Sequence, residues 1–313
     1  MNKNNAVLCI TLNPALDLTG NLQNIRLGKV NAITDANLHP AGKGVNVAKV
    51  LAELGANVCV SGFLGIENAS AFEALFDQHN ITDEFVRVAG ATRTNVKVVA
   101  CSGAVTDLNF PGFSITEQTI TAFNNKLEQL CQHYAYVVFA GSLPKGLPAS
   151  QLAGWIKLAK NKGCKVLVDT SGEALIAAIE AAPHMIKPNQ DELEELCQQA
   201  LNSIDDIKLP SANLALKGIE HVVISRGEKG ALWLHRERWM QAQPPSMKVV
   251  STVGAGDTFV ASFCWGLIQQ FDPIQQLNFA SAMSALAVAQ TNVGLPALDA
   301  LAKVQQQTII TQL

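Results

Sequence analysis

A carboxylate that directly follows two glycines is the strongest candidate for chemistry in the sequence. Asp257 ends the tetrapeptide Gly254-Ala255-Gly256-Asp257, which opens an apolar helical stretch that continues to Ile268. Backbone N–H groups at a helix N-terminus favour negative charge, such as the charge that develops on a transferring phosphoryl group. A carboxylate beside them could accept the proton of an attacking hydroxyl. An acid in the first turn also suits the helix dipole, so a purely structural Asp257 is the alternative.

A second glycine-rich turn precedes another helical pattern. Gly42, Lys43 and Gly44 are followed by Asn46 and by apolar positions that run through Leu54. Free N–H groups and the Lys43 ammonium could hold an anionic or hydroxylated ligand, and the glycines would let that ligand approach closely. An ordinary tight turn before a helix explains the same residues, because a short glycine-rich loop is a weak motif.

The segment IKPNQDEL has both a structural and a functional interpretation. Asn189 as an N-cap with Glu192 three residues later resembles a capping box, which is a sufficient structural reason for both. Alternatively, Asn189 and Glu192 orient a hydrated Mg²⁺ ion and Lys187 contacts a nucleotide phosphate. The sequence leaves both interpretations open.

Two alternating segments carry further candidates. In TRTNVKV, strand periodicity puts Arg93, Asn95 and Lys97 on one face, where two cations that flank an amide form a possible phosphate cradle. A solvated sheet face is the alternative. Asp17 shares a strand face with Thr19, where its carboxylate could accept hydrogen bonds from sugar hydroxyls or simply face water.

The elements that must position these residues alternate along the chain. Short apolar runs with β-branched residues predict strands over 6–12, 56–64, 136–142, 165–170 and 221–227. Segments of helical length and periodicity lie between them, such as 44–54, 69–79, 116–131 and 148–161. This order predicts an α/β fold with a doubly wound, mostly parallel sheet and helices on both faces. The candidate site is expected at the carboxyl ends of the strands.

A second, smaller sheet is expected beside the main one. Residues 15–22 and 92–108 tend to alternate polar and apolar, which is typical of half-exposed antiparallel strands. We find no linker, repeat or low-complexity segment. We therefore expect a single domain over 1–313, with a β lid formed by insertions at approximately 14–38 and 92–110 that closes over the site.

Composition excludes several classes of protein. The chain has 313 residues, 48% of them hydrophobic, and 23 Lys plus Arg against 26 Asp plus Glu give a net charge of −3. The chain has no excess of basic residues that would indicate a nucleic-acid partner. Residues 273–298 are free of charges but contain several Gln and Asn, so we interpret them as a buried helix and a loop, not a membrane span. The N-terminus lacks a signal-peptide pattern, so we expect a cytoplasmic protein.

Cysteine and histidine spacing gives no metal motif. Seven scattered cysteines include no CxxC pair, so we expect reduced core thiols and neither disulfides nor a zinc site. The six histidines are dispersed, none in an HExxH pattern, and each is interpreted as a surface or satisfied core residue. No Gly-x-x-x-x-Gly-Lys-Ser/Thr motif occurs, and GAGDTF lacks the third glycine of a dinucleotide fingerprint. These patterns disfavour a P-loop kinase and a nicotinamide dehydrogenase.

The motifs together resemble a known family. NPALD, AGKGVNVAKVLAELG, TRTNVKV, AGSLPKG, IKPNQDEL and STVGAGDTFVASF occur in this order over essentially the whole chain. The ordered set is similar to the phosphofructokinase B branch of the ribokinase-like carbohydrate kinases. Within that branch, AGKGVNVAKVL and TRTNVK are most similar to bacterial members that phosphorylate fructose 1-phosphate.

The resemblance implies a function and a set of site residues. It implies a kinase that converts fructose 1-phosphate and ATP to fructose 1,6-bisphosphate and ADP, with a Rossmann-like core, a β lid, Mg²⁺, and K⁺ as a further candidate ion. Asp257 would be the catalytic base for the sugar 6-hydroxyl. The remaining roles are an anion hole of Gly254, Ala255 and Gly256; substrate binding by Asp17, Gly42, Lys43, Asn46, Arg93, Lys97 and Ser142; and MgATP binding by Lys187, Asn189, Glu192, Ser225, Gly227, Gly230 and Thr252.

Other functions remain open at this stage. Tagatose-6-phosphate kinase and 6-phosphofructokinase activities belong to close relatives in the same branch. A non-catalytic sugar-phosphate sensor could keep the fold without the chemistry. We expect no nucleic-acid or membrane partner and a homodimer formed through the lid, because an exposed lid edge favours pairing. Lys29 lies in a lid segment that in relatives can reach the site of a partner subunit.

Overall fold

A large mixed sheet forms the centre of the protein. The computed structural model describes residues 5–102, 105–291 and 293–313. Within these ranges, an 11-stranded sheet has the order β15-β14-β13-β12-β11-β10-β9-β1-β4-β5, and β6 also pairs with β4. Its strands are β1 (Ala6–Thr11), β4 (Asn57–Gly65), β5 (Thr82–Asp83), β6 (Val86–Val88), β9 (Tyr136–Ala140), β10 (Lys165–Asp169), β11 (Met185–Ile186), β12 (His221–Ser225), β13 (Ala231–His235), β14 (Arg238–Gln243) and β15 (Ile309–Gln312).

The centre of this sheet is parallel and one edge is antiparallel. Strand β1 pairs in parallel with both β4 and β9, and parallel pairing continues through β10 and β11 to β12. Strands β13, β14 and β15 then add antiparallel pairs. The predicted mostly parallel sheet is therefore confirmed, and the carboxyl ends of its central strands meet along one edge.

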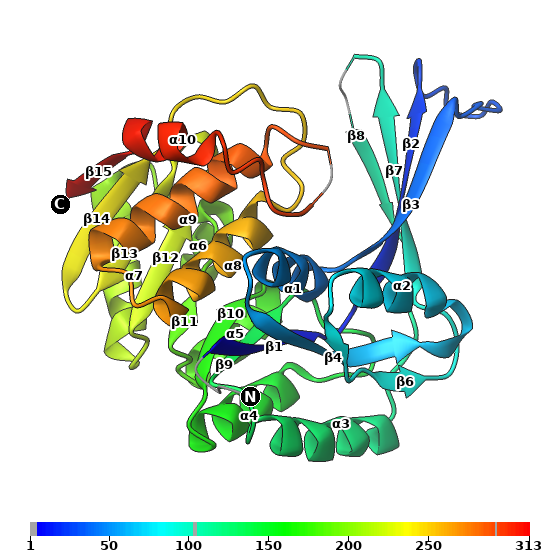
Figure 1. Cartoon of the computed structure of the whole chain (residues 1–313), viewed down its shortest axis with the longest axis horizontal. Helices are drawn as coiled ribbons and strands as arrows, with labels where there is room; N and C mark the ends of the chain where they lie inside the picture. Colours follow the sequence, from blue (N-terminus) through cyan, green and yellow to red (C-terminus); the bar gives the residue numbers. More distant parts are fainter. Residues whose placement is uncertain (1–4, 103–104, 292) are drawn as a thin grey trace.

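Helices cover both faces of the sheet (Figure 1). Alternate residues of β1 belong to different apolar clusters: Leu8 and Ile10 pack on one face, and Val7 and Cys9 pack on the other. The first face carries α3 (Glu117–Leu130), α4 (Ala149–Asn161), α5 (Gly172–Glu180), α6 (Gln190–Cys197) and α7 (Ile204–Leu216). The second carries α1 (Lys43–Glu53), α2 (Ser70–Gln78), α8 (Ala255–Ile268) and α9 (Pro273–Ala287). Helix α10 (Leu301–Gln307) packs against α9, and η2 (Ile66–Asn68) and η3 (Gly227–Lys229) are single 3₁₀ turns.

A separate four-stranded sheet projects from this body (Figure 1). Its order is β3-β2-β7-β8, with β2 (Ala15–Leu22), β3 (Asp35–Ala41), β7 (Arg93–Ala100) and β8 (Val105–Asn109). We had expected antiparallel strands, but β2 and β7 pair in parallel. The chain between them passes through the main body, and such a long crossover permits parallel pairing. The segment from Thr92 to Leu108 contributes two strands, β7 and most of β8.

The described structure tests three other expectations. The predicted strands and helices end within two residues of the observed ones, and the buried helix predicted within 273–298 is α9. The prediction that all cysteines are core thiols is wrong: Cys101 is exposed because it directly follows lid strand β7, and Cys197 is half-buried at the end of α6. Among the described residues, no helix has both the length and the apolar character to cross a membrane.

Candidate active site

The glycine turn before α8 places Asp257 in the first turn of that helix. Gly254 is the N-cap, with a left-handed backbone (φ 78°), and the helix begins at Ala255. A Cβ atom on Gly254 would lie 2.4 Å from a methyl carbon of Val293, so both the backbone and the packing require glycine here. Asp257 is the third helical residue and only 6% exposed. The backbone N–H groups that begin α8 therefore lie beside a buried carboxylate.

Burial changes the acidity of Asp257. Desolvation, followed by the negative charge of Asp169, raises the pKa of Asp257 from 3.8 to about 6. A hydrogen bond from Asn46 Nδ2 to Asp257 Oδ2 (2.7 Å) and the charges of Lys43 and Lys187 act in the opposite direction. A carboxylate with this pKa is largely ionised at neutral pH and close enough to neutrality to exchange a proton with a reacting hydroxyl.

The carboxylate of Asp169 forms ion pairs with two lysines of the site. Asp169 ends β10 at its carboxyl end and is 1% exposed. Its Oδ1 lies 3.3 Å from Lys43 Nζ and 3.4 Å from Lys187 Nζ, whereas its buried Oδ2 has no hydrogen-bond partner among the described residues. Sequence reasoning missed Asp169. Its signal was an acid that directly follows the apolar residues Val166, Leu167 and Val168 at the carboxyl end of a central strand, where the site residues of open α/β sheets gather.

Helix α1 carries two of the candidate site residues on one face. Lys43 is its first residue and Asn46 lies one turn later, so the first contacts Asp169 and the second contacts Asp257. Burial would lower the pKa of Lys43, but the nearby charges of Asp169, Asp257 and Glu192 outweigh it and raise the pKa. The Lys43 ammonium thus stays charged in a site with three carboxylates.

The glycines around Lys43 have a packing role. A Cβ atom on Gly42 would lie 2.9 Å from a Thr11 methyl carbon, and one on Gly44 would lie 2.7 Å from the Ile10 carbonyl oxygen. Gly42 also has a positive φ of 128°. These contacts let α1 begin directly against the end of β1. These close contacts explain why both positions are glycine, and it stays a prediction that the same turn also admits a ligand.

Lys187 is buried against the turn that begins α8. Its side chain is 5% exposed and its ion pair is with Asp169. A Cβ atom on Gly256 would lie 3.4 Å from Lys187 Nζ, so the ammonium lies directly beside the glycine turn. An anion at this turn would meet backbone N–H groups and a lysine charge together.

The structural interpretation of Asn189 and Glu192 is correct. Asn189 Oδ1 accepts a hydrogen bond from Glu192 N (2.7 Å), and Glu192 Oε2 accepts one from Asn189 N (2.8 Å). These two bonds form a capping box at the start of α6. Glu192 is still close enough to Lys43 to raise its pKa. The capping box therefore holds the Glu192 carboxylate near the lysines of the site.

The polar face of the lid sheet forms a second cluster. Asp17 in β2 is paired with Asn95 in β7 and with His39 in β3. Lys97 Nζ donates to Asp17 Oδ2 at 2.7 Å, and Asn95 Nδ2 donates to Asp17 Oδ1 at 3.1 Å. Asp17 is only 6% exposed, so it does not simply face water. The cluster gathers a carboxylate, an amide and an ammonium on one face.

Arg93 lies where the lid joins the body. Its guanidinium donates to the backbone oxygens of Asn13 and Pro14, both at 3.3 Å, and burial lowers the pKa of Arg93. Asn13 Nδ2 in turn donates to the exposed Ser142 hydroxyl at 3.1 Å. Arg93 and Ser142 thus meet at the Asn13-Pro14 segment that connects β1 with the lid.

The remaining nucleotide candidates are less tightly clustered. Ser225 ends β12 and forms a bridge with Asn189, whereas Gly227 and Gly230 form the adjacent turn with positive φ. A Cβ atom on Gly230 would lie 1.9 Å from the Ala242 carbonyl oxygen, which gives that glycine a packing reason. Thr252 is exposed just before the α8 turn. Lys29 is exposed in the loop between β2 and β3.

The comparisons with known proteins identify the family of the chain. Residues 3–300 match the model of the pfkB family carbohydrate kinases. The chain belongs to the pfkB family. A *Vibrio cholerae* protein named 1-phosphofructokinase is 50% identical over 307 residues, covering 98% of this chain and 97% of that protein. A *Haemophilus influenzae* protein of the same name is 44% identical and covers 98% and 99%.

A solved structure with 29% sequence identity to this chain supports the same fold. The structure of phosphofructokinase-2 from *Escherichia coli* in complex with potassium has a TM-score of 0.89 to this chain and 29% sequence identity. It covers 96% of this chain and 98% of the other. Membership of the pfkB family of carbohydrate kinases implies ATP as the nucleotide and a divalent metal ion. The doubly wound α/β fold with a small separate sheet is therefore that of a carbohydrate kinase.

Proposed function

We propose that this protein phosphorylates fructose 1-phosphate with ATP to give fructose 1,6-bisphosphate. The observation that carries the proposal is the arrangement of Asp257: a buried carboxylate with a raised pKa at the glycine turn of α8, hydrogen-bonded by Asn46. The names of the *Vibrio cholerae* and *Haemophilus influenzae* relatives supply the sugar phosphate. A sensor without chemistry would have no need to keep a buried, charged base beside an anion-binding turn.

The proposed chemistry assigns each group of the site a task. Asp257 accepts the proton of the sugar 6-hydroxyl as the hydroxyl oxygen attacks the γ-phosphorus of ATP; the bond from that phosphorus to the β–γ bridging oxygen breaks, and ADP leaves with its electron pair. The N–H groups of Gly254, Ala255 and Gly256, with Lys187 beside them, stabilise the charge on the transferring phosphoryl group. General-base transfer contributes on the order of a hundred- to ten-thousand-fold, and positioning supplies much of the rest.

The lid and the α1 turn are proposed to bind the sugar phosphate. Asp17 and Asn46, with the Gly42 turn, would bind hydroxyls, and Lys43 and Arg93 would contact the phosphate together with Lys97 and Ser142. Lys97 and Arg93 already have intrachain partners, since one pairs with Asp17 and the other with backbone oxygens. Substrate would therefore exchange with these partners as the lid closes.

MgATP is proposed to bind between α6, the β12 turn and α8. Mg²⁺ prefers oxygen ligands and usually keeps several waters. The donors fit that chemistry: Asp169 Oδ2 is buried without a partner, and the capping box holds the Glu192 carboxylate and Asn189 close by. When bound, the ion neutralises the nucleotide phosphates. Ser225, Gly227, Gly230 and Thr252 would line the nucleotide, and K⁺ is proposed as an activating ion because the *Escherichia coli* relative binds it.

A coupled ADP-release assay tests the substrate. We would compare kcat/KM for fructose 1-phosphate, fructose 6-phosphate and tagatose 6-phosphate with MgATP. A preference of about a hundredfold for fructose 1-phosphate, roughly 2.7 kcal/mol in transition-state binding, is the expected result. Preference for a 6-phosphate would overturn the proposed phosphate pocket and leave the role of Asp257 intact. No turnover of any of them would favour the sensor.

We further propose that the whole chain acts as one kinase domain that dimerises through its lid. The lid face opposite Asp17 carries Leu18, paired with Leu38 on one side and with Val96 on the other, and Val96 is paired with Leu108. Leu38 and Leu108 are 55% and 50% exposed, which leaves an apolar face open to a second copy. Lys29, in the loop of the same lid, would then reach the partner's site.

The oligomeric state tests the lid proposal. Leu38→Asp is expected to convert a dimer to a monomer in sedimentation analysis, whereas Leu216→Asp, at a position 85% exposed on α7, should leave the dimer unchanged. A wild-type monomer, or a dimer that survives Leu38→Asp, would refute pairing through this face. The exposed thiol of Cys101 suits a reducing compartment, and we propose a cytoplasmic location on that ground.

A further inference from the structure

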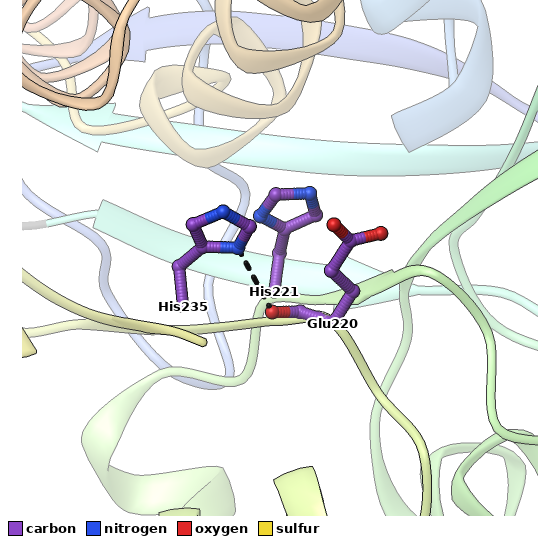
Figure 2. Close-up of side chains that lie close together, drawn as sticks. All are labelled: Glu220, His221 and His235. Atoms are coloured by element: carbon purple, nitrogen blue, oxygen red, sulfur yellow. Dashed lines mark hydrogen bonds between the residues drawn. The ribbon is translucent and has the colours of Figure 1, made fainter. Parts of the chain in front are cut away.

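A histidine and carboxylate cluster lies at the end of the sheet opposite the candidate active site. Glu220 precedes β12, His221 begins it, and His235 is the paired residue at the end of β13. Among the described residues, these three gather one potential ligand atom each within 4.8 Å of one another (Figure 2). Ser225, near the proposed nucleotide site, lies at the other end of β12. The cluster is therefore separate from the kinase chemistry.

The histidines show features of metal ligands. His221 is 7% exposed, and its buried Nδ1 has no hydrogen-bond partner among the described residues. His235 Nδ1 lies 3.3 Å from the Glu220 backbone oxygen; because a carbonyl only accepts, Nδ1 carries the proton and Nε2 keeps its lone pair. Ligating histidines commonly donate their other ring N–H to a carbonyl in this way.

We propose that Glu220, His221 and His235 bind a divalent transition-metal ion, with Zn²⁺ as the preferred ion. Two imidazoles and a carboxylate suit Zn²⁺, and a water would complete a tetrahedral site. Mg²⁺ would not compete, because it selects oxygen ligands. This inference does not depend on the proposed kinase activity. It also differs from our expectation that every histidine is a surface or satisfied core residue.

Small side-chain movements would complete the site. Donor atoms of a tetrahedral site with bonds of about 2.1 Å lie about 3.4 Å apart. The donor atoms, now within 4.8 Å, must approach one another by up to about 1.4 Å. The rings of His221 and His235 stack with centroids 4.5 Å apart, so His235 must rotate out of the stack. Glu220 is exposed and His235 half-buried, which leaves both free to close on the fixed His221.

The charges around the cluster make a specific prediction. Arg236 forms an ion pair with Glu220 at 3.5 Å and is 77% exposed. Arg236 therefore competes with the metal for the carboxylate.

Titration of the tag-free protein with Zn²⁺ and Co²⁺ tests the site. Calorimetry should give one Zn²⁺ ion per chain, and Co²⁺ should develop the visible absorption of a tetrahedral complex. Glu220→Gln and His235→Gln, which change partly exposed side chains, should each weaken binding at least tenfold. Arg236→Gln should tighten binding severalfold, because it removes the competing cation.

Matched controls separate this site from adventitious binding. His133→Gln removes an exposed histidine in the turn after α3, and Cys101→Ser removes the exposed thiol. Both should leave the affinity unchanged. Wild-type affinity in Glu220→Gln and His235→Gln, or a loss of binding in either control, would overturn the proposal. So would weaker binding in Arg236→Gln, since the ion-pair competition would then be absent.

Discussion

Replacing Asp257 with asparagine should stabilise the folded protein at neutral pH while it removes activity. The pKa of Asp257 rises from 3.8 to about 6, chiefly because burial penalises the charged carboxylate. At 1.36 kcal/mol per pKa unit, this difference corresponds to about 3 kcal/mol of destabilisation at pH well above 6. An amide carries no charge and can still accept the hydrogen bond from Asn46. We therefore expect Asp257→Asn to gain about 1–3 kcal/mol in the free energy of unfolding.

The gain should depend on pH in a defined direction. A carboxyl whose folded pKa is raised binds more protons in the folded state between pH 3.8 and about 6. The loss of stability that the buried, ionised Asp257 causes in the wild type is thus fully present above about pH 6. It shrinks as the pH falls through that value and is absent below pH 3.8. The wild-type and Asp257→Asn stabilities should converge toward pH 4. For the same reason, wild-type kcat/KM should fall as the pH drops below about 6.

Urea unfolding of both proteins without ligands at pH 7.5, 6 and 4.5 measures the effect. Nucleotide binding and turnover are measured on the same samples, with a loss of about a hundred- to ten-thousand-fold in kcat expected and nucleotide binding retained. An Asp257→Asn protein that is less stable than wild type at pH 7.5 would refute the electrostatic reasoning. Turnover within about threefold of wild type would remove Asp257 from the role of base.

Three further substitutions follow from the same site. Asp169→Asn should destabilise the protein by about 3 kcal/mol in urea unfolding, because it leaves the buried Lys187 ammonium without its ion pair; unchanged stability would contradict this. Lys43→Ala should lower the ratio of kcat/KM on fructose 1-phosphate to that on fructose 6-phosphate at least tenfold, and an unchanged ratio would exclude Lys43 as a selectivity residue. Gly254→Ala should lower both the melting temperature and kcat, since its φ of 78° and the contact with Val293 leave no room for a methyl group; wild-type values for both would contradict the packing.

Local sequence signals predicted the elements of the fold well. The alternation of apolar runs and helical segments gave the parallel core, and the spacing from Asn189 to Glu192 gave the capping box. Signals of this kind lie within a few residues of each other. Pairing over long distances was harder: periodicity identifies β2 and β7 as half-exposed strands but carries no information on their direction, and they proved to be parallel.

The candidate site was predicted incompletely for the same reason. The GAGD motif identifies Asp257 as a candidate, because its glycines and carboxylate are adjacent in the sequence. Asp169 has no local motif, and its two lysine partners come from residues 43 and 187, which only the fold brings together. The cluster of Glu220, His221 and His235 is hidden likewise, since a hairpin register places His235 beside His221.

The two buried carboxylates of the site have partners that suit different tasks. Both ammonium groups, Lys43 and Lys187, lie within ion-pair distance of Asp169, and the hydrogen bond to Asp257 comes from the neutral amide of Asn46. If the lysines contacted Asp257 directly, its pKa would fall and it would be a weaker base. Because Asp169 holds them instead, they stay close enough to meet phosphate groups at the glycine turn. In the proposed mechanism, Asp169 would therefore act as a positioning residue that keeps the two cations in the site without neutralising the proposed base.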